Sequence, residues 1–148
     1  MTQNNEATRM LIEQMKQVYT DKVIDHTINS RNRGDIPQAD AYAKVTGPCG
    51  DTIEMWFKVT GGKIFKATFE PDGCATTVAC GSMATELITG KDVMEAAKIS
   101  QADILAALGG LPEVNEHCAL LAADTIKATV RDYIATKNAP WKKTYRTT

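Results

Sequence analysis

"TIEMWFKVTGGKIFKATFE", residues 52–70, is the stretch that decides the fold of this chain. Residues 52–60 alternate between apolar and other side chains, as a half-buried strand does. The apolar positions on its one face are Ile53, Met55, Phe57 and Val59. Gly61-Gly62 then supplies the positive φ angles of a tight hairpin, so residues 63–70 are predicted to return as a second strand. Its residues on one side are Phe65, Ala67 and Phe69.

Working outward, a third strand precedes this hairpin and a helical region precedes that strand. "AYAKVT", residues 41–46, alternates loosely and completes three short strands, which we expect to be antiparallel. Residues 7–28 read as helix, in one piece or two, because apolar residues recur at spacings near three to four. Those residues are Leu11, Met15, Val18, Val23 and Ile24.

Two further helices are predicted after the hairpin. One follows Cys74 and ends at Gly90, a plausible C-terminal cap. Its apolar stripe is Val78, Ala79, Met83, Leu87 and Ile88. The last helix is expected to begin near Pro112, a residue suited to a first turn. Its apolar residues, at steps of four, are Val114, Cys118, Ala122, Ile126, Val130 and Ile134.

Length and charge narrow the class of protein. With 148 residues, the chain is expected to fold as one domain without disulfides. The 17 basic and 18 acidic side chains nearly cancel and are spread along the chain, which argues against nucleic acid as a partner. The polar N-terminus resembles neither a signal peptide nor a transit peptide, and no apolar run has the roughly 18 residues of a membrane span. We therefore expect a cytoplasmic protein with no membrane partner.

Four cysteines are the chemically informative residues. Their even number permits two disulfides, but in a chain without an export signal free, metal-bound or catalytic thiols are expected instead. Cys49 lies on the bend "TGPCGD" between two strands, and Cys74 and Cys118 lie near helix N-termini. The partial positive charge of a helix N-terminus lowers a thiol pKa and favours the metal-binding thiolate.

Asp51 and His117 add a hard oxygen and a borderline nitrogen next to these thiols. Taken singly, each residue could be a small buried side chain or a capping group, but together they indicate a shared site for a thiophilic metal. Cys80 follows Cys74 by six residues, so on a helix it is turned about 120° away and displaced by about 9 Å. We interpret Cys80 as a thiol of the core, or one that supports the site from behind, and not as a ligand. His26 is more often a histidine on a helix face than a catalytic base, and we leave it unassigned.

Four motifs, in order, resemble those of the IscU/NifU-type iron–sulfur cluster assembly scaffold proteins. They read "YTDKVIDHTINSRNRGD", "GPCGD", "GCATTVACGS" and "HCALLAADTIKATVRDY". The spacing is similar to the family's, with 25 residues from Cys49 to Cys74 and 44 from Cys74 to Cys118. On this resemblance residues 19–137 form the scaffold domain, residues 1–18 a helical extension and residues 138–148 a C-terminal tail.

The resemblance implies an α+β fold in which helices cover one face of a three-stranded antiparallel sheet and the cysteines converge at one exposed end. It implies that Cys49, Cys74 and Cys118 assemble a cluster, with Asp51 and His117 completing or tuning the site. A cysteine desulfurase would deliver sulfur, iron would enter, and a 2Fe–2S cluster would form for transfer to apo-proteins. The same site would also accept zinc. Such a protein is a scaffold and not an enzyme.

The chain also departs from the family. Leu111–Asn115 reads "LPEVN", whereas the family often carries a Leu-Pro-Pro-Val-Lys signal for a dedicated Hsp70 chaperone. We therefore expect that chaperone to bind weakly. Cys80 stands where classical members usually have serine.

Three other functions are compatible with the same residues. The first is a zinc-dependent sulfurtransferase that works with a cysteine desulfurase, although such members usually carry an insertion that the 44-residue span lacks. The second is a Cys118 nucleophile with His117 as base, but neighbours on a helix point about 100° apart, which disfavours a direct hydrogen bond. The third is a binding protein whose thiols are inert.

Overall fold

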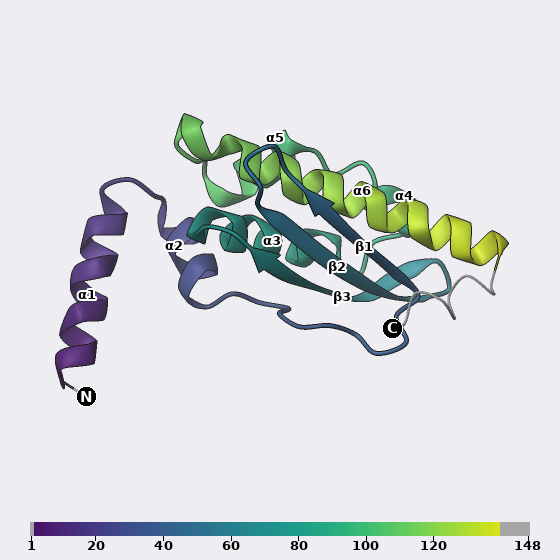
Figure 1. The fold of residues 1–148 in the computed structure, drawn as a ribbon, viewed down its shortest axis with the longest axis horizontal. Coiled ribbons are helices and arrows are strands. Elements are labelled where there is room, and N and C mark those ends of the chain that lie inside the picture. The colour runs from purple at the N-terminus through teal and green to yellow at the C-terminus, as the bar shows by residue number, and fades with distance from the viewer. Residues whose placement is uncertain (1, 140–148) are drawn as a thin grey trace.

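The computed structural model describes residues 2–139, whose elements follow the order helix, sheet, helix along the chain (Figure 1). They are α1 (Thr2–Lys16), α2 (Asp21–Ile28), β1 (Ala41–Thr46), β2 (Thr52–Thr60), β3 (Lys63–Asp72), α3 (Ala75–Ile88), α4 (Val93–Ala96), α5 (Gln101–Leu108), the 3₁₀ turn η1 (Glu113–Asn115) and α6 (Glu116–Asn138). The predicted α+β class is confirmed. Most of the expected C-terminal tail, residues 140–148, lies outside the described residues.

The sheet is antiparallel, with strand order β1-β2-β3. Gly61 and Gly62 have φ angles of 60° and 79° and join β2 to β3 in a two-residue turn, as the sequence predicts. At the other end of the sheet Thr52 of β2 pairs with Thr46 of β1 and Asp72 of β3. The β1–β2 turn and the end of β3 therefore lie side by side, opposite the glycine turn.

One residue of β3 faces the opposite way to the prediction. A register shift next to Val59 leaves Phe65 outside the regular pairing, and its side chain is 56% exposed. Ile64 is fully buried in its place. The expectation that Phe65 shares a side with Ala67 and Phe69 is therefore wrong, because an extra residue at a β-bulge reverses the alternation.

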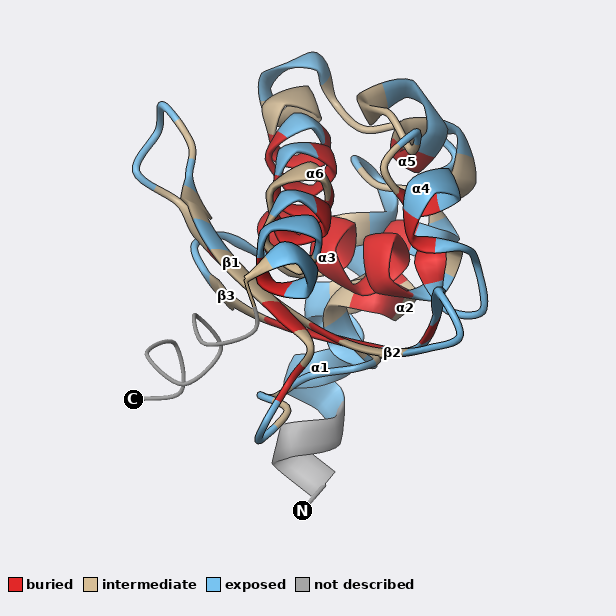
Figure 2. Ribbon diagram, turned by 90° about the vertical axis from the view of Figure 1, so that its right-hand side faces the viewer, coloured by how far each residue is buried: buried red, intermediate tan, exposed pale blue. Residues whose placement is uncertain are grey.

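Helices α3 and α6 pack against one face of the sheet, α3 on β3 and α6 on β1 and β2 (Figure 2). Helix α3 is buried on most sides, and at Gly81 an added Cβ would come within 2.4 Å of the Phe69 ring. The largest apolar side chains of the core are Phe57, Phe69, Ile53, Met55, Ile64, Ile88, Ile104, Leu108 and Ile126. Burial of this apolar surface is what holds the helices on the sheet.

The N-terminal helical region consists of two helices, one of the two possibilities that its sequence pattern leaves open. Thr20 caps α2 by accepting a hydrogen bond from the Val23 N–H, and its hydroxyl donates to the Leu108 carbonyl at the end of α5. Leu11 and Val18 are 55% and 58% exposed, so they are not part of the core that Val23 enters. Helix α1 instead projects away from the rest of the fold (Figure 1).

The region between Gly90 and Cys118 differs most from the prediction. Helix α6 begins at Glu116 and not near Pro112, which instead precedes η1, and Val114 is 78% exposed. Helices α4 and α5 were not predicted. Among residues 2–139, no helix is both long enough and apolar enough to span a membrane.

Candidate functional site

The bend that carries Cys49 is a turn closed by its own backbone. The Gly47 N–H donates to the Asp51 carbonyl over 2.8 Å, and the Gly50 N–H donates to the Gly47 carbonyl over 3.0 Å. Gly50 has a φ of 90°, a value that residues with a Cβ rarely adopt. This geometry leaves Cys49 exposed beyond the end of the sheet.

Cys74 is the N-cap residue of α3, as the sequence predicts, and its side chain is exposed. Burial alone would raise the pKa of its thiol. That effect is outweighed by the Thr76 hydroxyl, by the backbone N–H groups of Thr76 and Thr77, and by a longer contact with the Thr77 hydroxyl, which together hold the pKa below its ordinary value. The strongest contact joins the Cys74 Sγ and the Thr76 Oγ1 over 2.9 Å. Cys74 is therefore the thiol best prepared to be a thiolate.

Cys118 lies in the first turn of α6 and is fully buried. Its Sγ is 4.0 Å from the Cys74 Sγ and 3.3 Å from the Thr76 Oγ1. Burial raises the pKa of the Cys118 thiol, although its contacts with Thr76 and Thr77 oppose that effect. Two neighbouring thiols thus differ in their readiness to lose a proton.

Asp51 brings a carboxylate to these two thiols. The Thr77 Oγ1 donates to the Asp51 Oδ2 over 2.7 Å, and this hydrogen bond is the main reason why the pKa of Asp51 is below its ordinary value. The carboxylate packs against Gly73, where an added Cβ would come within 2.5 Å of it. The backbone N–H of Cys74 and the side chains of Cys74 and Cys49 lower this pKa further, and the Cys74 Sγ lies 3.7 Å from the Asp51 Oδ2.

The structure brings Asp51, Cys74 and Cys118 into one cluster in which the potential ligand atoms all lie within 4.8 Å of one another. Two sulfurs and one oxygen suit a borderline or soft metal ion such as zinc or iron. Cys49 is exposed on the same turn, two residues before Asp51, but is not one of these three residues. Of the five predicted site residues, the structure therefore brings three together, and Cys49 and His117 are their neighbours in the chain.

His117 is closer to Cys118 than we expected. Its Nε2 lies 3.7 Å from the Cys118 Sγ, which is within the range of a long hydrogen bond to sulfur. The expectation that the two side chains are poorly placed for a direct hydrogen bond is therefore wrong. The 100° angle separates the two Cβ directions, but the length of the imidazole spans that separation.

Cys80 and His26 are both buried, and neither belongs to the cluster of Asp51, Cys74 and Cys118. Cys80 is fully buried in the core, and burial raises the pKa of its thiol strongly, which confirms the interpretation as a core thiol. The His26 Nδ1 lies 2.7 Å from the Ser82 Oγ, so the imidazole joins α2 to α3. Burial lowers the pKa of His26 and favours its neutral form.

Thr76 and Thr77 are the residues of this cluster that the sequence analysis did not single out. Both are buried in the first turn of α3, and their hydroxyls contact Cys74, Cys118 and Asp51. The available signal is a pair of threonines two and three residues after a cysteine at a helix start. Asn115 of η1 adds to the network by donating from its Nδ2 to the Thr76 Oγ1 over 3.4 Å.

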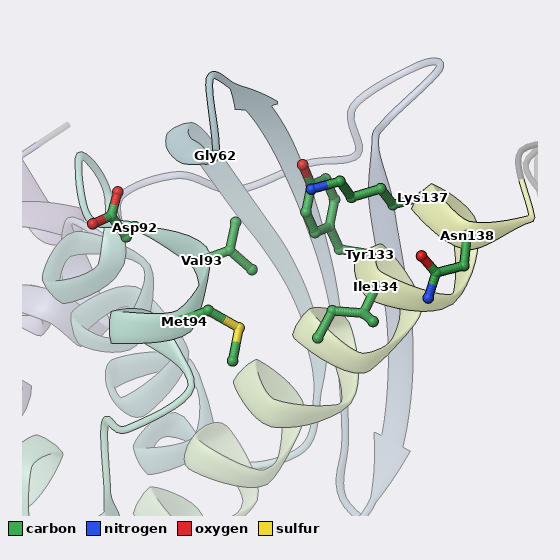
Figure 3. A pocket seen from close by; sticks show the side chains of 8 residues that line it. All are labelled: Gly62, Asp92, Val93, Met94, Tyr133, Ile134, Lys137 and Asn138. Atoms are coloured by element: carbon green, nitrogen blue, oxygen red, sulfur yellow. The ribbon is translucent and has the colours of Figure 1, made fainter.

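A hollow of about 420 Å³ lies between the last turns of α6 and the start of α4 (Figure 3). Its walls are the glycine turn of the β2–β3 hairpin, the start of α4 and the last turns of α6. The lining residues are Gly62, Asp92, Val93, Met94, Tyr133, Ile134, Lys137 and Asn138. Because the glycine turn and the β1–β2 turn are at opposite ends of the sheet, this hollow and the cysteine cluster are separate.

Comparison with known proteins identifies the family of this fold. The model of the NifU-like N-terminal domain matches residues 18–140. The iron–sulfur cluster assembly scaffold protein IscU 1 of Archaeoglobus fulgidus is 44% identical over 117 residues, which cover 78% of this chain and 76% of that protein. The corresponding protein IscU of Haemophilus influenzae is 40% identical over 122 residues, with 79% and 96% of the two chains covered.

A solved structure has the same fold. The N-terminal part of a nitrogen-fixing NifU-like protein from Brucella abortus superposes with a TM-score of 0.64 at 21% identity, and the match covers 82% of this chain and 97% of that one. Sequence and fold thus lead to the same result: the chain belongs to the NifU-like N-terminal domain family.

Proposed function

We propose that this protein is a scaffold on which iron–sulfur clusters are assembled and from which they are passed to apo-proteins. The observation that carries the proposal is the convergence of Cys74, Cys118 and Asp51 at one end of the sheet, beside the exposed Cys49. Relatives at 38–44% identity are named iron–sulfur cluster assembly proteins, and several of those names include the word scaffold. The cluster is the cargo of such a protein and not a resident cofactor.

The four positions differ in the role that we propose for them. Cys74, with its lowered pKa, is suited to take iron first, whereas the buried Cys118 needs the charge of a metal to favour its thiolate. Cys49 on its turn completes the set of three thiolates. A 2Fe–2S cluster needs four ligand positions, so Asp51 or His117 supplies the remaining one.

A carboxylate in this set supports release of the cargo. Oxygen binds iron less softly than a fourth thiolate does, so Asp51 is proposed as the exchangeable ligand. On this view Asp51→Ala keeps the three thiolates and yields a cluster that persists longer and transfers more slowly. A purely structural Asp51 would instead give a lower melting temperature without a longer cluster lifetime.

The partners follow from the chemistry of the cargo. We propose that a cysteine desulfurase supplies sulfur and that apo iron–sulfur proteins accept the cluster. The described cysteines are all free thiols, which fits a reducing compartment such as the cytoplasm. An Hsp70 chaperone is expected to bind weakly, because Glu113 adds an anion to the exposed segment around Val114.

The alternative function is a zinc-dependent sulfurtransferase that uses the same thiols. One relative, from Drosophila melanogaster, is named an assembly enzyme, whereas those from Archaeoglobus fulgidus and Haemophilus influenzae are named scaffold proteins. We propose that this chain acts without catalytic turnover. Bound zinc would then be a competitor for the site.

Anaerobic incubation with iron, cysteine and a cysteine desulfurase tests the proposal. Visible absorption of a cluster should develop, with iron and acid-labile sulfide in equal amounts on the protein. Subsequent addition of an apo-ferredoxin should move the cluster to the acceptor. Sulfur bound as persulfide without iron would support the sulfurtransferase, and the absence of both products would contradict the proposed function.

A further inference from the structure

We propose that Thr77 is a positioning residue for Asp51: its hydroxyl holds the carboxylate against Cys74 and Cys118 and thereby sets how Asp51 engages and leaves a bound metal. The inference rests on the proposed function of this site. It gives a role at the site to Thr77, a residue that is not itself proposed as a metal ligand. The structural basis is the 2.7 Å hydrogen bond from the Thr77 Oγ1 to the Asp51 Oδ2.

The direction of this hydrogen bond is fixed by proton count. A threonine hydroxyl has one proton, and an ionised carboxylate can only accept. The proton of Thr77 is therefore committed to Asp51, and its contacts with Cys74 and Cys118 are long, at 3.5 and 3.6 Å. A hydrogen bond to an ionised acceptor is also stronger than one between neutral groups.

Thr76 has a different role, although it is the adjacent residue of the same type. Its Oγ1 lies 2.9 Å from the Cys74 Sγ and 3.3 Å from the Cys118 Sγ, and it accepts from Asn115. The hydroxyl of Thr76 thus contacts the two thiols, whereas that of Thr77 donates its proton to the carboxylate. This division makes Thr76 a matched control for Thr77.

The surroundings keep Asp51 in place between two fixed groups. Thr77 is fully buried in the first turn of α3, and the χ1 angle of a threonine in a helix is restricted to two rotamers. On the other side Gly73 has no Cβ, so the carboxylate packs directly on its backbone. Without the Thr77 hydroxyl, the Asp51 side chain would lose its strongest orienting contact.

Zinc affinity provides a direct test that needs no cluster. Competition with a chromophoric chelator should show that Thr77→Val weakens Zn²⁺ binding by about tenfold, the lower end for loss of a group that orients a ligand. Asp51→Ala should weaken binding further, and the double variant should bind no more weakly than Asp51→Ala alone. Thr77→Ser, which keeps the hydroxyl, should restore most of the affinity.

The control variant separates the two threonines. Thr76→Val should change zinc affinity through the thiols, so it should still weaken binding when Asp51 is already alanine, whereas Thr77→Val should not. Wild-type affinity in Thr77→Val, or additive effects of Thr77→Val and Asp51→Ala, would overturn the inference. If valine at this buried position lowers the melting temperature of the metal-free protein, Thr77→Ala repeats the measurement.

The lifetime of an assembled iron–sulfur cluster is a second measurement that compares the same variants. Thr77→Val should shift the cluster lifetime in the same direction as Asp51→Ala, and the double variant should go no further. Failure of the wild-type protein to assemble any cluster would count against the proposed function, whereas the zinc measurements would still decide the role of Thr77. The two proposals can therefore fail separately.

Discussion

The Sγ atoms of Cys74 and Cys118 lie 4.0 Å apart, yet the pKa of Cys74 is lowered and that of Cys118 is raised. Both thiols contact the same two threonine hydroxyls, so the difference comes from their surroundings. Cys74 is exposed at a helix N-cap and also receives backbone N–H groups, whereas Cys118 is fully buried. Cys74 is thus the thiol that loses its proton more readily, whereas Cys118 stays protonated to a higher pH.

Alkylation of the metal-free protein should reveal this difference. Iodoacetamide attacks the thiolate, so Cys74 should be labelled faster than Cys118, and its rate should rise with pH through a lower pH range. Peptide mass spectrometry at a series of pH values measures both rates in one sample. The fully buried Cys80 is an internal control that should react last. Labelling of Cys118 before Cys74 would show that the order of the two pKa values is wrong.

Cysteine variants should divide into two groups during reconstitution. Removal of Cys49, Cys74 or Cys118 leaves too few soft ligands, so each Cys→Ser variant should lose the visible absorption of the cluster. Cys80→Ser should assemble a normal cluster, with a free energy of unfolding lower by about 1–3 kcal/mol if the buried hydroxyl finds no partner. Loss of assembly in Cys80→Ser together with normal assembly in Cys49→Ser would refute this set of ligands.

Zinc should stabilise the folded protein, because it binds the native cluster of thiols more tightly than the unfolded chain. At a free Zn²⁺ concentration of 100 times Kd, the free energy of unfolding should rise by about 2.7 kcal/mol. Thermal melting over a zinc titration measures this effect. The Cys74→Ser/Cys118→Ser variant is the control, and its melting temperature should not respond. An equal response in wild type and variant would place the zinc elsewhere.

Gly81→Ala should test the close packing of α3 on the sheet. The new Cβ would lie 2.4 Å from the Phe69 ring, so the helix or the ring must move, at a cost of about 1–3 kcal/mol in the free energy of unfolding. Urea denaturation measures this cost. Phe69→Leu in the same background should recover part of it by removing the ring atoms. A Gly81→Ala protein as stable as the wild type would contradict the packing described above.

The sheet could be predicted from sequence because its signals are local. Strict alternation in residues 52–60 and two adjacent glycines specify a hairpin without reference to the rest of the chain. Phe65 could not be placed correctly, since a bulge depends on how two strands align and not on either strand alone. Leu11 fits a helical pattern but is exposed, because periodicity does not say whether another element covers that face.

The helices between Gly90 and Cys118 illustrate a signal that was present but not used. Ser100 and Asp103 form a reciprocal capping box at the start of α5, and Gly109 has a φ of 79° at its end. Both are recognisable in sequence. In α6 the regular apolar spacing extends back to Val114, although the α-helix itself begins only at Glu116.

The site shows a similar limit. Cysteines near predicted turns and helix starts could be assigned to one site because thiols are rare and chemically distinctive. Threonine is common and serves many purposes, so nothing in the sequence separates Thr77 from the adjacent Thr76, although both stand at the start of α3. Its contact with Asp51 depends on the packing of the β1–β2 turn against α3, which local patterns do not encode.

Cys49, Cys74 and Cys118 stand on three separate segments: the β1–β2 turn, the start of α3 and the first turn of α6. A metal or cluster held by all of them would cross-link the chain, closing one loop of 25 residues and another of 44. Cross-links reduce the conformational entropy of the unfolded chain, and more so for longer loops. The bound cluster would then stabilise the protein that carries it for as long as it stays bound. The loaded protein should therefore resist proteolysis, and its sensitivity to protease should return once an acceptor has taken the cluster.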